Sequence, residues 1–177
     1  MTPTDSTSFR IREAHRDDVP ALARLHVATF KETHGGFRPP SEELRASQWR
    51  AAFETDVGWF CYVAEDARGE LVGFAKGTRH DGGVPGFQGE LSKIYVLRRC
   101  HRHGLGLQLV MHVARRFLSE DVTSMLLFGD AKSPSNGFYE HLGAERLLSE
   151  RGEFHGGYGW RDLNRLVASH HRESTAP

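Results

Sequence analysis

Residues 97–110, LRRCHRHGLGLQLV, constrain the fold more than any other part of the chain. They follow a β-rich run over residues 87–97 and open a helix near Gly104 whose apolar residues form one stripe. The first amides of a helix lack intrahelical partners, and glycine lets a ligand approach the backbone closely. The loop before the glycines is basic: Arg98, Arg99, His101, Arg102 and His103. This order predicts a pyrophosphate site, with a plain turn flanked by solvated arginines as the alternative.

The same segment fits a nucleic-acid or dinucleotide site poorly. Lys plus Arg and Asp plus Glu both number 23, so the chain as a whole has no field that attracts a polyanion. The basic cluster is compact and is not spread over a long face with stacking aromatics. Gly104-Leu105-Gly106 also lacks the third glycine and the acidic residue of the dinucleotide fingerprint. We therefore expect no nucleic-acid partner.

Length and composition predict one globular domain. With 177 residues, 38% of them hydrophobic, the chain can bury an ordinary core, so we expect a single domain over residues 8–165 with flexible termini at residues 1–7 and 166–177. No apolar run approaches the roughly 18 residues that span a bilayer, which predicts a cytoplasmic protein without a membrane partner. Cys61 and Cys100 are expected to be free thiols. The eleven histidines show no metal-ligand spacing, so no metal is expected.

Periodicity and turn residues predict an α/β (α+β) fold. Strands are expected over residues 9–13, 59–65, 71–78, 87–97, 125–129, 144–150 and 154–163. Helices are expected between Pro20 and Gly35, from Ser41 to near Gly58, from Gly104, and within SPSNGFYEHLG at residues 133–143. Ser133 and Gly143 read as the N-cap and the C′ residue of that last helix. This order predicts a mixed, mostly antiparallel central sheet flanked by helices.

Two segments resemble the GNAT family of N-acetyltransferases. ELSKIYVLRRCHRHGLGLQLV is similar to the family's central motif, a strand ending in an apolar-aromatic-Val triplet followed by Arg/Gln-x-x-Gly-x-Gly/Ala. SPSNGFYEHLGAE resembles its second motif, Asn-x-x-x-x-Phe-Tyr-Glu-x-Leu-Gly. The expected element order also fits the GNAT fold from Phe9 to Leu163. The resemblance covers nearly the whole chain and implies an acyltransferase that uses acetyl-CoA and no metal.

The resemblance also implies which residues contact the coenzyme. They are the strand end and the glycine turn, with one residue from the second motif: Ile94, Tyr95, Val96, His101, Arg102, His103, Gly104, Leu105, Gly106, Leu107 and Ser133. Two of them depart from the family pattern. His101 occupies a position usually held by Arg or Gln, and backbone amides together with its own hydrogen bond can compensate. Ser133 stands where an asparagine is common, so it either contacts the coenzyme or caps its own helix.

Two residues are candidates for catalysis. Glu90 lies on the strand before the basic loop, where burial would raise its pKa toward that of a useful base, acting directly or through water. Its alternative is an ion pair with Lys93 or a nearby arginine. Tyr139 matches the family's tyrosine, whose hydroxyl can protonate the coenzyme sulfur, and its alternative is an aromatic core residue. A nucleophilic Cys100, its pKa lowered by Arg99 and His101, is the rival chemistry.

The acceptor is expected to be a primary amine of a small molecule or a peptide. Four residues of the first two helices are candidates for its pocket: Phe30, Thr33, Phe37 and Trp49. Four nearby carboxylates could attract a cation: Glu32, Glu42, Glu43 and Glu54. A cationic small amine follows, with a solvated helix face as the alternative. The rival function is an acyl-CoA-binding regulatory module, and a homodimeric assembly is left open.

Overall fold

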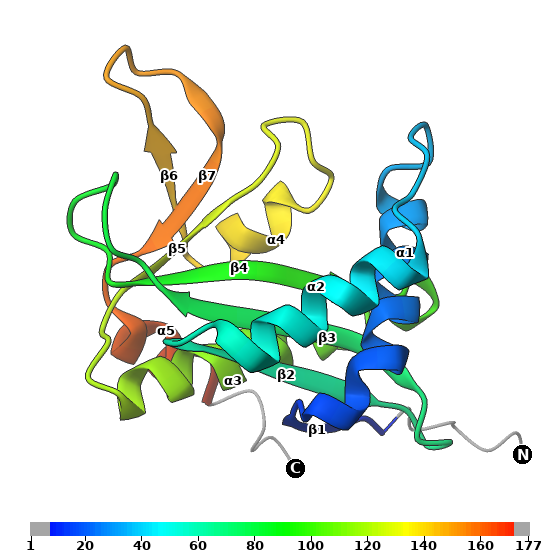
Figure 1. Cartoon of the computed structure of the whole chain (residues 1–177). Coiled ribbons are helices and arrows are strands. Elements are labelled where there is room, and N and C mark those ends of the chain that lie inside the picture. The colour runs from blue at the N-terminus through cyan, green and yellow to red at the C-terminus, as the bar shows by residue number, and fades with distance from the viewer. Residues whose placement is uncertain (1–7, 172–177) are drawn as a thin grey trace, which may run out of the picture. The chain divides into compact units, whose positions relative to one another are not determined.

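The computed structural model describes residues 8–171 (Figure 1). Its strands are β1 (Arg10–Glu13), β2 (Trp59–Glu65), β3 (Leu71–Arg79), β4 (Gly89–Val96), β5 (Met125–Phe128), β6 (Glu145–Leu148) and β7 (Phe154–Trp160). Its α-helices are α1 (Val19–Thr33), α2 (Glu42–Thr55), α3 (Leu105–Ser119), α4 (Asn136–His141) and α5 (Leu163–His171). Short 3-10 helices lie at Arg16–Asp18 and Arg98–Cys100. None of the helices in the described residues is long and apolar enough to cross a membrane.

The strands follow the order β1-β2-β3-β4-β5-β7-β6 in a 7-stranded sheet. Strand β4 pairs with β5 in parallel, whereas the β1–β2, β5–β7 and β6–β7 pairs are antiparallel. The predicted mixed, mostly antiparallel sheet flanked by helices is therefore confirmed.

The described chain divides into two compact units. Unit 1 contains residues 8–76 and 93–110, and unit 2 contains residues 77–92 and 111–171. The chain passes from one unit to the other within β3, β4 and α3. The single domain expected over residues 8–165 stays a prediction, and each unit is described by itself.

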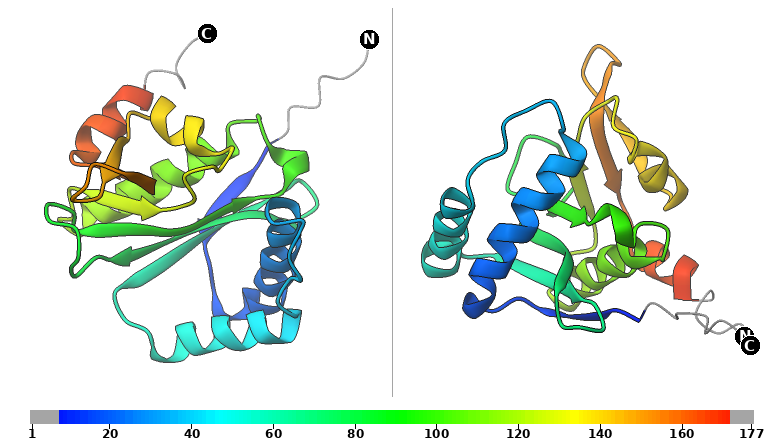
Figure 2. Two further views of the ribbon diagram at one scale, coloured as in Figure 1. Left: turned by 90° about the horizontal axis from the view of Figure 1, so that it is seen from above. Right: turned by 90° about the vertical axis from the view of Figure 1, so that its right-hand side faces the viewer.

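Unit 1 is built around two helices that pack against each other, α1 and α2 (Figure 2). Helix α1 begins with a proline in its first turn, as expected. Helix α2 begins at the predicted cap, because the Ser41 Oγ accepts a hydrogen bond from the Leu44 amide at 3.1 Å. The helices bury their apolar residues with those of the strands in one cluster: Ala14, Val19, Leu22, Leu25, Trp49, Cys61, Val63 and Phe74.

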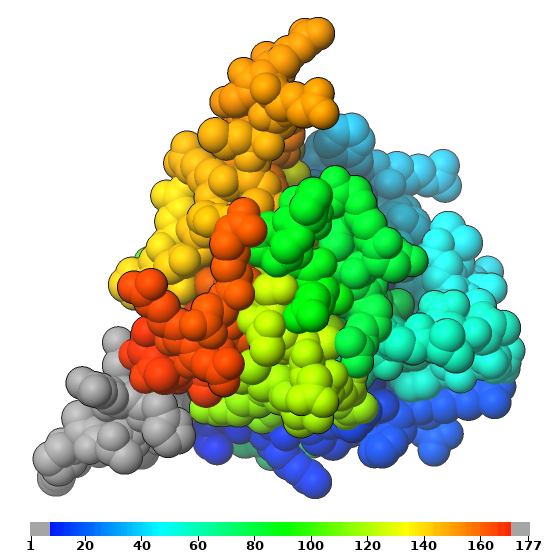
Figure 3. Space-filling model, turned by 90° about the vertical axis from the view of Figure 1, so that its left-hand side faces the viewer, coloured from blue at the N-terminus to red at the C-terminus, as the bar shows by residue number. Residues whose placement is uncertain are grey.

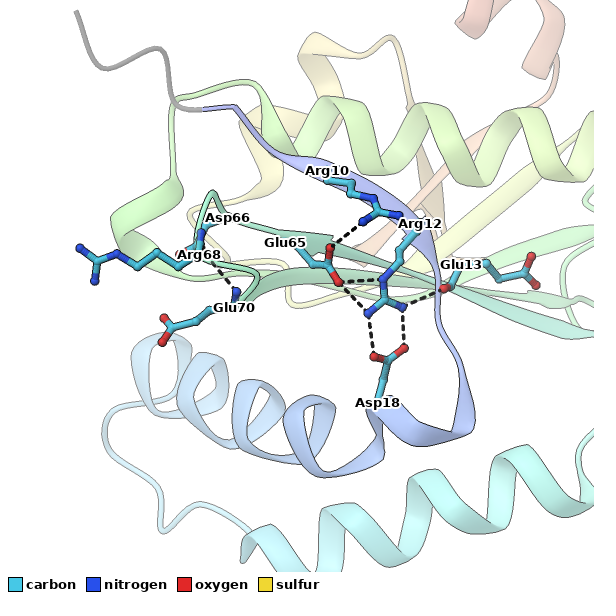
Figure 4. Close-up of polar contacts among 8 residues, drawn as sticks. All are labelled: Arg10, Arg12, Glu13, Asp18, Glu65, Asp66, Arg68 and Glu70. Carbon is cyan, nitrogen blue, oxygen red and sulfur yellow. Dashed lines mark hydrogen bonds and ion pairs between the residues drawn. The ribbon is translucent and has the colours of Figure 1, made fainter. Parts of the chain in front are cut away.

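An ion-pair network joins β1, β2 and the start of α1 (Figure 4). The Arg12 guanidinium makes a bidentate contact with Asp18, at 2.7 and 2.8 Å, and donates from Nε to Glu65 at 2.7 Å. The hydrogen bond from Arg12 holds the pKa of Asp18 below its usual value. The bidentate Arg12–Asp18 contact fixes the start of α1 more firmly than a single surface ion pair would.

Unit 2 carries the β6–β7 hairpin, which projects from its surface (Figure 3). The hairpin turn closes through hydrogen bonds from the Ser149 amide to the Glu153 carbonyl and from Gly152 to Ser149. Strand β7 also pairs with β5, at Met125↔Trp160. Gly89 is required at the start of β4 because a Cβ there would lie 2.8 Å from the ring of Phe117 on α3. The contact lets α3 pack closely on the strand.

The ends of the chain differ from the prediction at two places. Residues 166–171, expected to belong to a flexible terminus, form part of α5, and the strand expected to reach residue 163 ends at Trp160. The Asp162 Oδ1 accepts hydrogen bonds from the Asn164 and Arg165 amides and so starts α5. Residues 1–7 and 172–177 lie outside the described residues, so their expected flexibility is untested.

Helix α4 also starts later than expected. It begins at Asn136, with Ser135 rather than Ser133 as its N-cap. The Ser133 Oγ instead accepts a hydrogen bond from the Ser135 amide at 3.2 Å, within the turn that precedes the helix. The predicted end is confirmed, because Gly143 follows the C-cap Leu142 with a φ of 76°.

Candidate active site

The strongest candidate for ligand binding in unit 1 is the N-terminus of α3. The helix is anchored by apolar residues such as Leu109 and Val110, both fully buried. Gly104 precedes the first helical residue with a φ of 76°, and its carbonyl accepts a hydrogen bond from the Gln108 amide at 3.1 Å. A Cβ added at Gly104 would have no atom within 4 Å, so the turn faces open space. The residues present therefore fit an anionic ligand at the first amides of α3.

The basic loop is held mainly by contacts within unit 1. The Arg98 amide donates to the Glu32 carboxylate at 2.7 Å, and Arg99 lies 3.5 Å from Asp66. The His101 Nε2 lies 2.8 Å from the Val96 carbonyl oxygen, so its proton is directed to the backbone. Arg102, which has a φ of 63°, is exposed, as are His103 and Gly104. Of the basic side chains, only those of Arg102 and His103 are left to face a ligand.

The other coenzyme candidates follow one another at the end of β4. Ile94, Tyr95 and Val96 are half-buried. The Tyr95 ring packs against His26 and Phe74 at centroid distances of 5.5 Å each, so its side chain is part of the interior of unit 1. The backbone of this strand end leads directly into the basic loop. Leu105, Gly106 and Leu107 form the first turn of α3.

The two cysteines are not activated nucleophiles. Cys100 is only 4% exposed, and burial raises its pKa despite the neighbouring Arg99. Burial also raises the pKa of Cys61. The structure thus contradicts the rival chemistry in which Arg99 and His101 activate Cys100. Both cysteines are free thiols, as expected.

A cavity of about 250 Å³ opens in unit 1 beside Trp49. Its polar lining comes from α1, α2, the residue that follows α2, β3 and β4. These residues are His26, Arg45, Gln48, Asp56, Lys76 and Lys93. Trp49 is the residue of the predicted acceptor set that lines it. Trp49 itself is 4% exposed, and the Lys76 Nζ lies 5.9 Å from its ring centroid and 4.6 Å from that of Trp59.

The other predicted acceptor residues lie elsewhere in unit 1. Phe30 stacks on His34 at a centroid distance of 4.7 Å, and the Thr33 hydroxyl donates to the Thr29 carbonyl at 2.9 Å. Phe37 is 73% exposed. The structure does not bring these three residues together with Trp49 around one cavity.

The carboxylates expected beside Trp49 are also placed differently. Glu32 contacts Arg98, and Glu54 pairs with Arg16. Glu42 and Glu43 lie exposed in the first turn of α2, where they favour the helix dipole. None of these four glutamates lines the cavity beside Trp49, and the acidic, cation-attracting pocket stays a prediction. The cavity beside Trp49 is lined by three cationic side chains and one carboxylate.

In unit 2, Glu90 has a partner that the sequence did not indicate. Its carboxylate lies 3.7 Å from the His80 Nδ1, and the two side chains are 28% and 9% exposed. His80 follows β3, and its amide donates to the Gln88 carbonyl, which closes the β3–β4 connection. The expected alternative for Glu90 was an ion pair with Lys93 or an arginine. The sequence does not show that the end of β3 pairs with the residues before β4, and this pairing is what places His80 beside Glu90.

Tyr139 lies on α4 within an aromatic cluster of unit 2. Its ring centroid is 5.4 Å from that of Phe138, 5.6 Å from that of Tyr158 and 6.4 Å from that of Trp160. Tyr139 is half-buried, so packing fixes its ring while part of the side chain reaches solvent. Both of its predicted roles, proton donor and aromatic packing residue, are compatible with this position.

No group of side chains in the described residues is suited to hold a metal ion. A family model for the acetyltransferase (GNAT) family matches residues 20–144. The uncharacterized N-acetyltransferase YuaI of Bacillus subtilis is 28% identical over 164 residues, which are 88% of this chain and 95% of the relative. The probable N-acetyltransferase Rv2775 of Mycobacterium tuberculosis is 24% identical over 144 residues, which are 76% of this chain and 78% of the relative.

Solved structures show the same fold at low identity. PaiA N-acetyltransferase of Thermoplasma acidophilum, in complex with coenzyme A, has a TM-score of 0.63 and 17% identity, over 86% of this chain and 98% of the other. A GNAT acetyltransferase of Staphylococcus aureus Mu50 has a TM-score of 0.70 and 15% identity, over 88% and 99%. Fold and family model agree, and the chain is an N-acetyltransferase of the GNAT family.

Proposed function

We propose that the protein transfers the acetyl group of acetyl-CoA directly to a primary amine of a small molecule. The observation that carries the proposal is the N-terminus of α3, where Gly104 faces open space directly before the first helical amides. The cavity of about 250 Å³ in unit 1 supports a small acceptor, since pockets for drug-sized ligands measure about 300–1,000 Å³. The two free cysteines favour the reducing cytoplasm as its compartment.

Acetyl-CoA supplies an activated thioester and a pyrophosphate by which it is held. Backbone amides of Leu105, Gly106 and Leu107 would bind the pyrophosphate, helped by the exposed side chains of Arg102 and His103. His101 would act indirectly, because its hydrogen bond to the Val96 carbonyl orients the strand end next to the loop. Ile94 and Tyr95 would contribute backbone groups. Ser133 is engaged in its own turn, which weakens its assignment as a coenzyme contact.

Proton transfer is assigned to residues of unit 2. The amine nitrogen forms a bond to the acetyl carbon as the carbon–sulfur bond breaks, so one proton leaves the nitrogen and one reaches the sulfur. Glu90 would accept the first proton, directly or through water, and the neighbouring His80 imidazole would orient its carboxylate. The Tyr139 hydroxyl would donate the second. Packing of the Tyr139 ring against Tyr158 and Trp160 would limit its motion.

An acetyl-CoA turnover screen, followed by release of free thiol, tests the proposal. The panel contains polyamines, aminosugars, amino acids and peptide N-termini. Gly104→Asp would place a carboxylate where the pyrophosphate binds, so coenzyme affinity should fall strongly. Gly83→Asp makes the same change at an exposed glycine that also has a positive φ, 87°, and open space around it, and it should leave affinity unchanged.

Two results would count against this function. Unchanged coenzyme affinity in a folded Gly104→Asp protein would remove the assigned pyrophosphate site. Coenzyme binding without turnover of any amine would favour an acyl-CoA-binding regulatory module instead.

The role of Glu90 is tested separately. Glu90→Gln should slow turnover and flatten the acidic limb of the pH profile of turnover. An unchanged limb would mean that water or an already deprotonated amine suffices.

A further inference from the structure

The cavity beside Trp49 has an excess of positive charge that comes from separate elements. Arg45 lies on α2, Lys76 on β3 and Lys93 on β4, and Asp56 is the carboxylate in the lining. The strands and helices of unit 1 therefore bring three cationic side chains to one small volume. Three cations in one small volume raise the positive potential there, and this potential attracts an anion.

Polar atoms at the same cavity lack hydrogen-bond partners among the described residues. They are the Trp49 Nε1, the Arg45 Nε and the His26 Nδ1. Trp49 is 4% exposed and His26 is 3% exposed, so neither atom is satisfied by bulk water. Buried polar groups in native proteins are almost always paired. The indole and guanidinium nitrogens can only donate, so their missing partner is an acceptor.

The pKa of His26 responds to the positive charges that line the cavity. Burial, and to a smaller extent the charges of Arg45 and Lys93, together lower its pKa to about 3. The imidazole is therefore neutral near pH 7 and adds no charge to the lining. Its Nδ1 can still donate or accept one hydrogen bond. The rings that contact His26 are those of Trp49, Phe74 and Tyr95.

The cavity is poorly suited to a cationic acceptor group. The ring faces that could hold an ammonium already lie near the Lys76 Nζ, which is 4.6 Å from the Trp59 centroid and 5.9 Å from that of Trp49. A second cation there would meet repulsion from Lys76 and from Arg45. An oxyanion would meet donors and positive charge instead.

We propose that this cavity binds an oxyanion, the carboxylate or phosphate group of the amine acceptor, so that the enzyme acetylates amines that carry an acidic group. The proposal rests on the proposed function. A volume of about 250 Å³ accommodates such a group with a short carbon chain. Lys93 also directly precedes Ile94–Val96 on β4, the segment assigned to the coenzyme, so the cavity adjoins the coenzyme strand within unit 1.

Binding is measured first, without turnover. Inorganic phosphate and acetate are titrated into the full-length protein while the indole N–H resonance of Trp49, assigned with Trp49→Phe, is followed by NMR. A saturable downfield shift is expected, because the indole gains an acceptor. Arg45→Gln should weaken binding about tenfold or more, since a charge-assisted hydrogen bond is lost. Arg50→Gln removes the same charge from an exposed site on the same helix and should change affinity little.

The outcomes separate three possibilities. No saturable shift at Trp49 with either anion would overturn the proposal, and so would displacement of bound phosphate by coenzyme A, which would make the cavity a coenzyme subsite. A response to phosphate alone or to acetate alone would identify which acidic group the cavity takes. If the variants fail to fold, the titration of the unmodified protein still decides.

Turnover then tests the link to the acceptor. O-phosphoethanolamine is compared with ethanolamine, and β-alanine with propylamine, at equal concentrations of unprotonated amine. The acidic member of at least one pair should have a kcat/KM about tenfold higher or more, and Arg45→Gln should remove the preference. Equal use of both members would overturn the assignment to the acceptor. Anion binding without thiol release from any amine would instead contradict the proposed function and leave the anion site in place.

Discussion

Two tryptophans, one in each unit, are buried to the same extent and have different polar surroundings. Trp49 in unit 1 and Trp160 in unit 2 are both 4% exposed. The Trp160 Nε1 donates to the Leu142 carbonyl at 3.0 Å, whereas the Trp49 Nε1 has no hydrogen-bond partner among the described residues. Two equally buried indole rings can therefore differ in whether their N–H groups are hydrogen-bonded. A buried indole N–H without an acceptor lowers the stability of the folded protein. A ligand that accepts a hydrogen bond from it can restore that stability.

The residues around each tryptophan repeat the contrast. In unit 2 the Tyr158 hydroxyl donates to the Glu140 carboxylate at 2.7 Å, so both polar atoms of that aromatic pair are bonded. In unit 1 the His26 Nδ1 and the Trp49 Nε1 both lack hydrogen-bond partners within residues 8–171, and both residues line one cavity. The unit 2 cluster is complete by itself. The unit 1 cluster is completed by the acceptor group that we propose.

The largest expected effect concerns Tyr139, a half-buried member of the unit 2 cluster. Tyr139→Phe removes one hydroxyl and keeps the ring contacts, so turnover should fall on the order of a hundredfold while the melting temperature changes little. Tyr158→Phe is the matched control, because it removes the hydroxyl that bonds Glu140 and should lower stability more than turnover. Rates equal to the parent enzyme in Tyr139→Phe would make that residue a packing residue only.

The second prediction concerns the two tryptophans. Trp160→Phe leaves the buried Leu142 carbonyl without the indole donor, whereas Trp49→Phe removes an N–H that has no acceptor in the described part of the chain. Both substitutions shorten the ring, so this part of the loss is similar. Trp160→Phe should therefore reduce the free energy of unfolding by about 1–3 kcal/mol more than Trp49→Phe. Denaturant unfolding measures the difference, and equal losses would show that Trp49 is also satisfied internally.

The third prediction is an acid-dependent loss of stability that originates at His26. Its pKa is lowered from 6.5 to about 3, so the unfolded chain binds a proton that the folded chain does not. Stability should therefore be fully present above pH 6.5 and should fall as the pH drops from there toward 3. The loss from pH 7 to pH 5.5 should be about 1 kcal/mol, and His26→Phe should reduce that slope. An anion in the cavity should raise the pKa of His26 and weaken the dependence, which urea titrations with and without phosphate would detect.

Sequence reasoning located the elements with strong local signals. The Ser41 cap, the glycine after α4 and the apolar stripe of α3 each depend on a few neighbouring residues, and the structure has all three. Helix α5 was missed, although Asp162 carries a usable capping signal, because its nine residues are mostly polar. Ser133 was misread because serines at two nearby positions can both cap a helix.

The candidate site was harder to predict from the sequence than the fold, because it depends on contacts between distant segments. The glycine turn before α3 is a local arrangement and could be read directly. The pairing of His80 with Glu90 and the meeting of Arg45, Lys76 and Lys93 depend on contacts between distant segments. Residue types on α2 suggested an acidic pocket, yet its glutamates face solvent or other partners. Net charge on a helix thus does not predict the charge of the cavity beneath it.

The smallest expected effect compares a cation in each cluster. The Lys76 Nζ lies 4.6 Å from the Trp59 ring centroid in unit 1, and the Arg146 guanidinium lies 4.8 Å from that of Phe154 in unit 2. Lys76→Met removes one positive charge from the cavity lining, so phosphate affinity should fall about two- to fivefold, less than in Arg45→Gln because no unpaired donor is lost. Arg146→Met removes a similar ring-bound cation outside the cavity and should leave phosphate affinity unchanged. Calorimetric titration of both variants decides the point. Equal losses in the two would mean that phosphate responds to net charge alone, and a selective loss in Lys76→Met would place the anion within reach of that side chain.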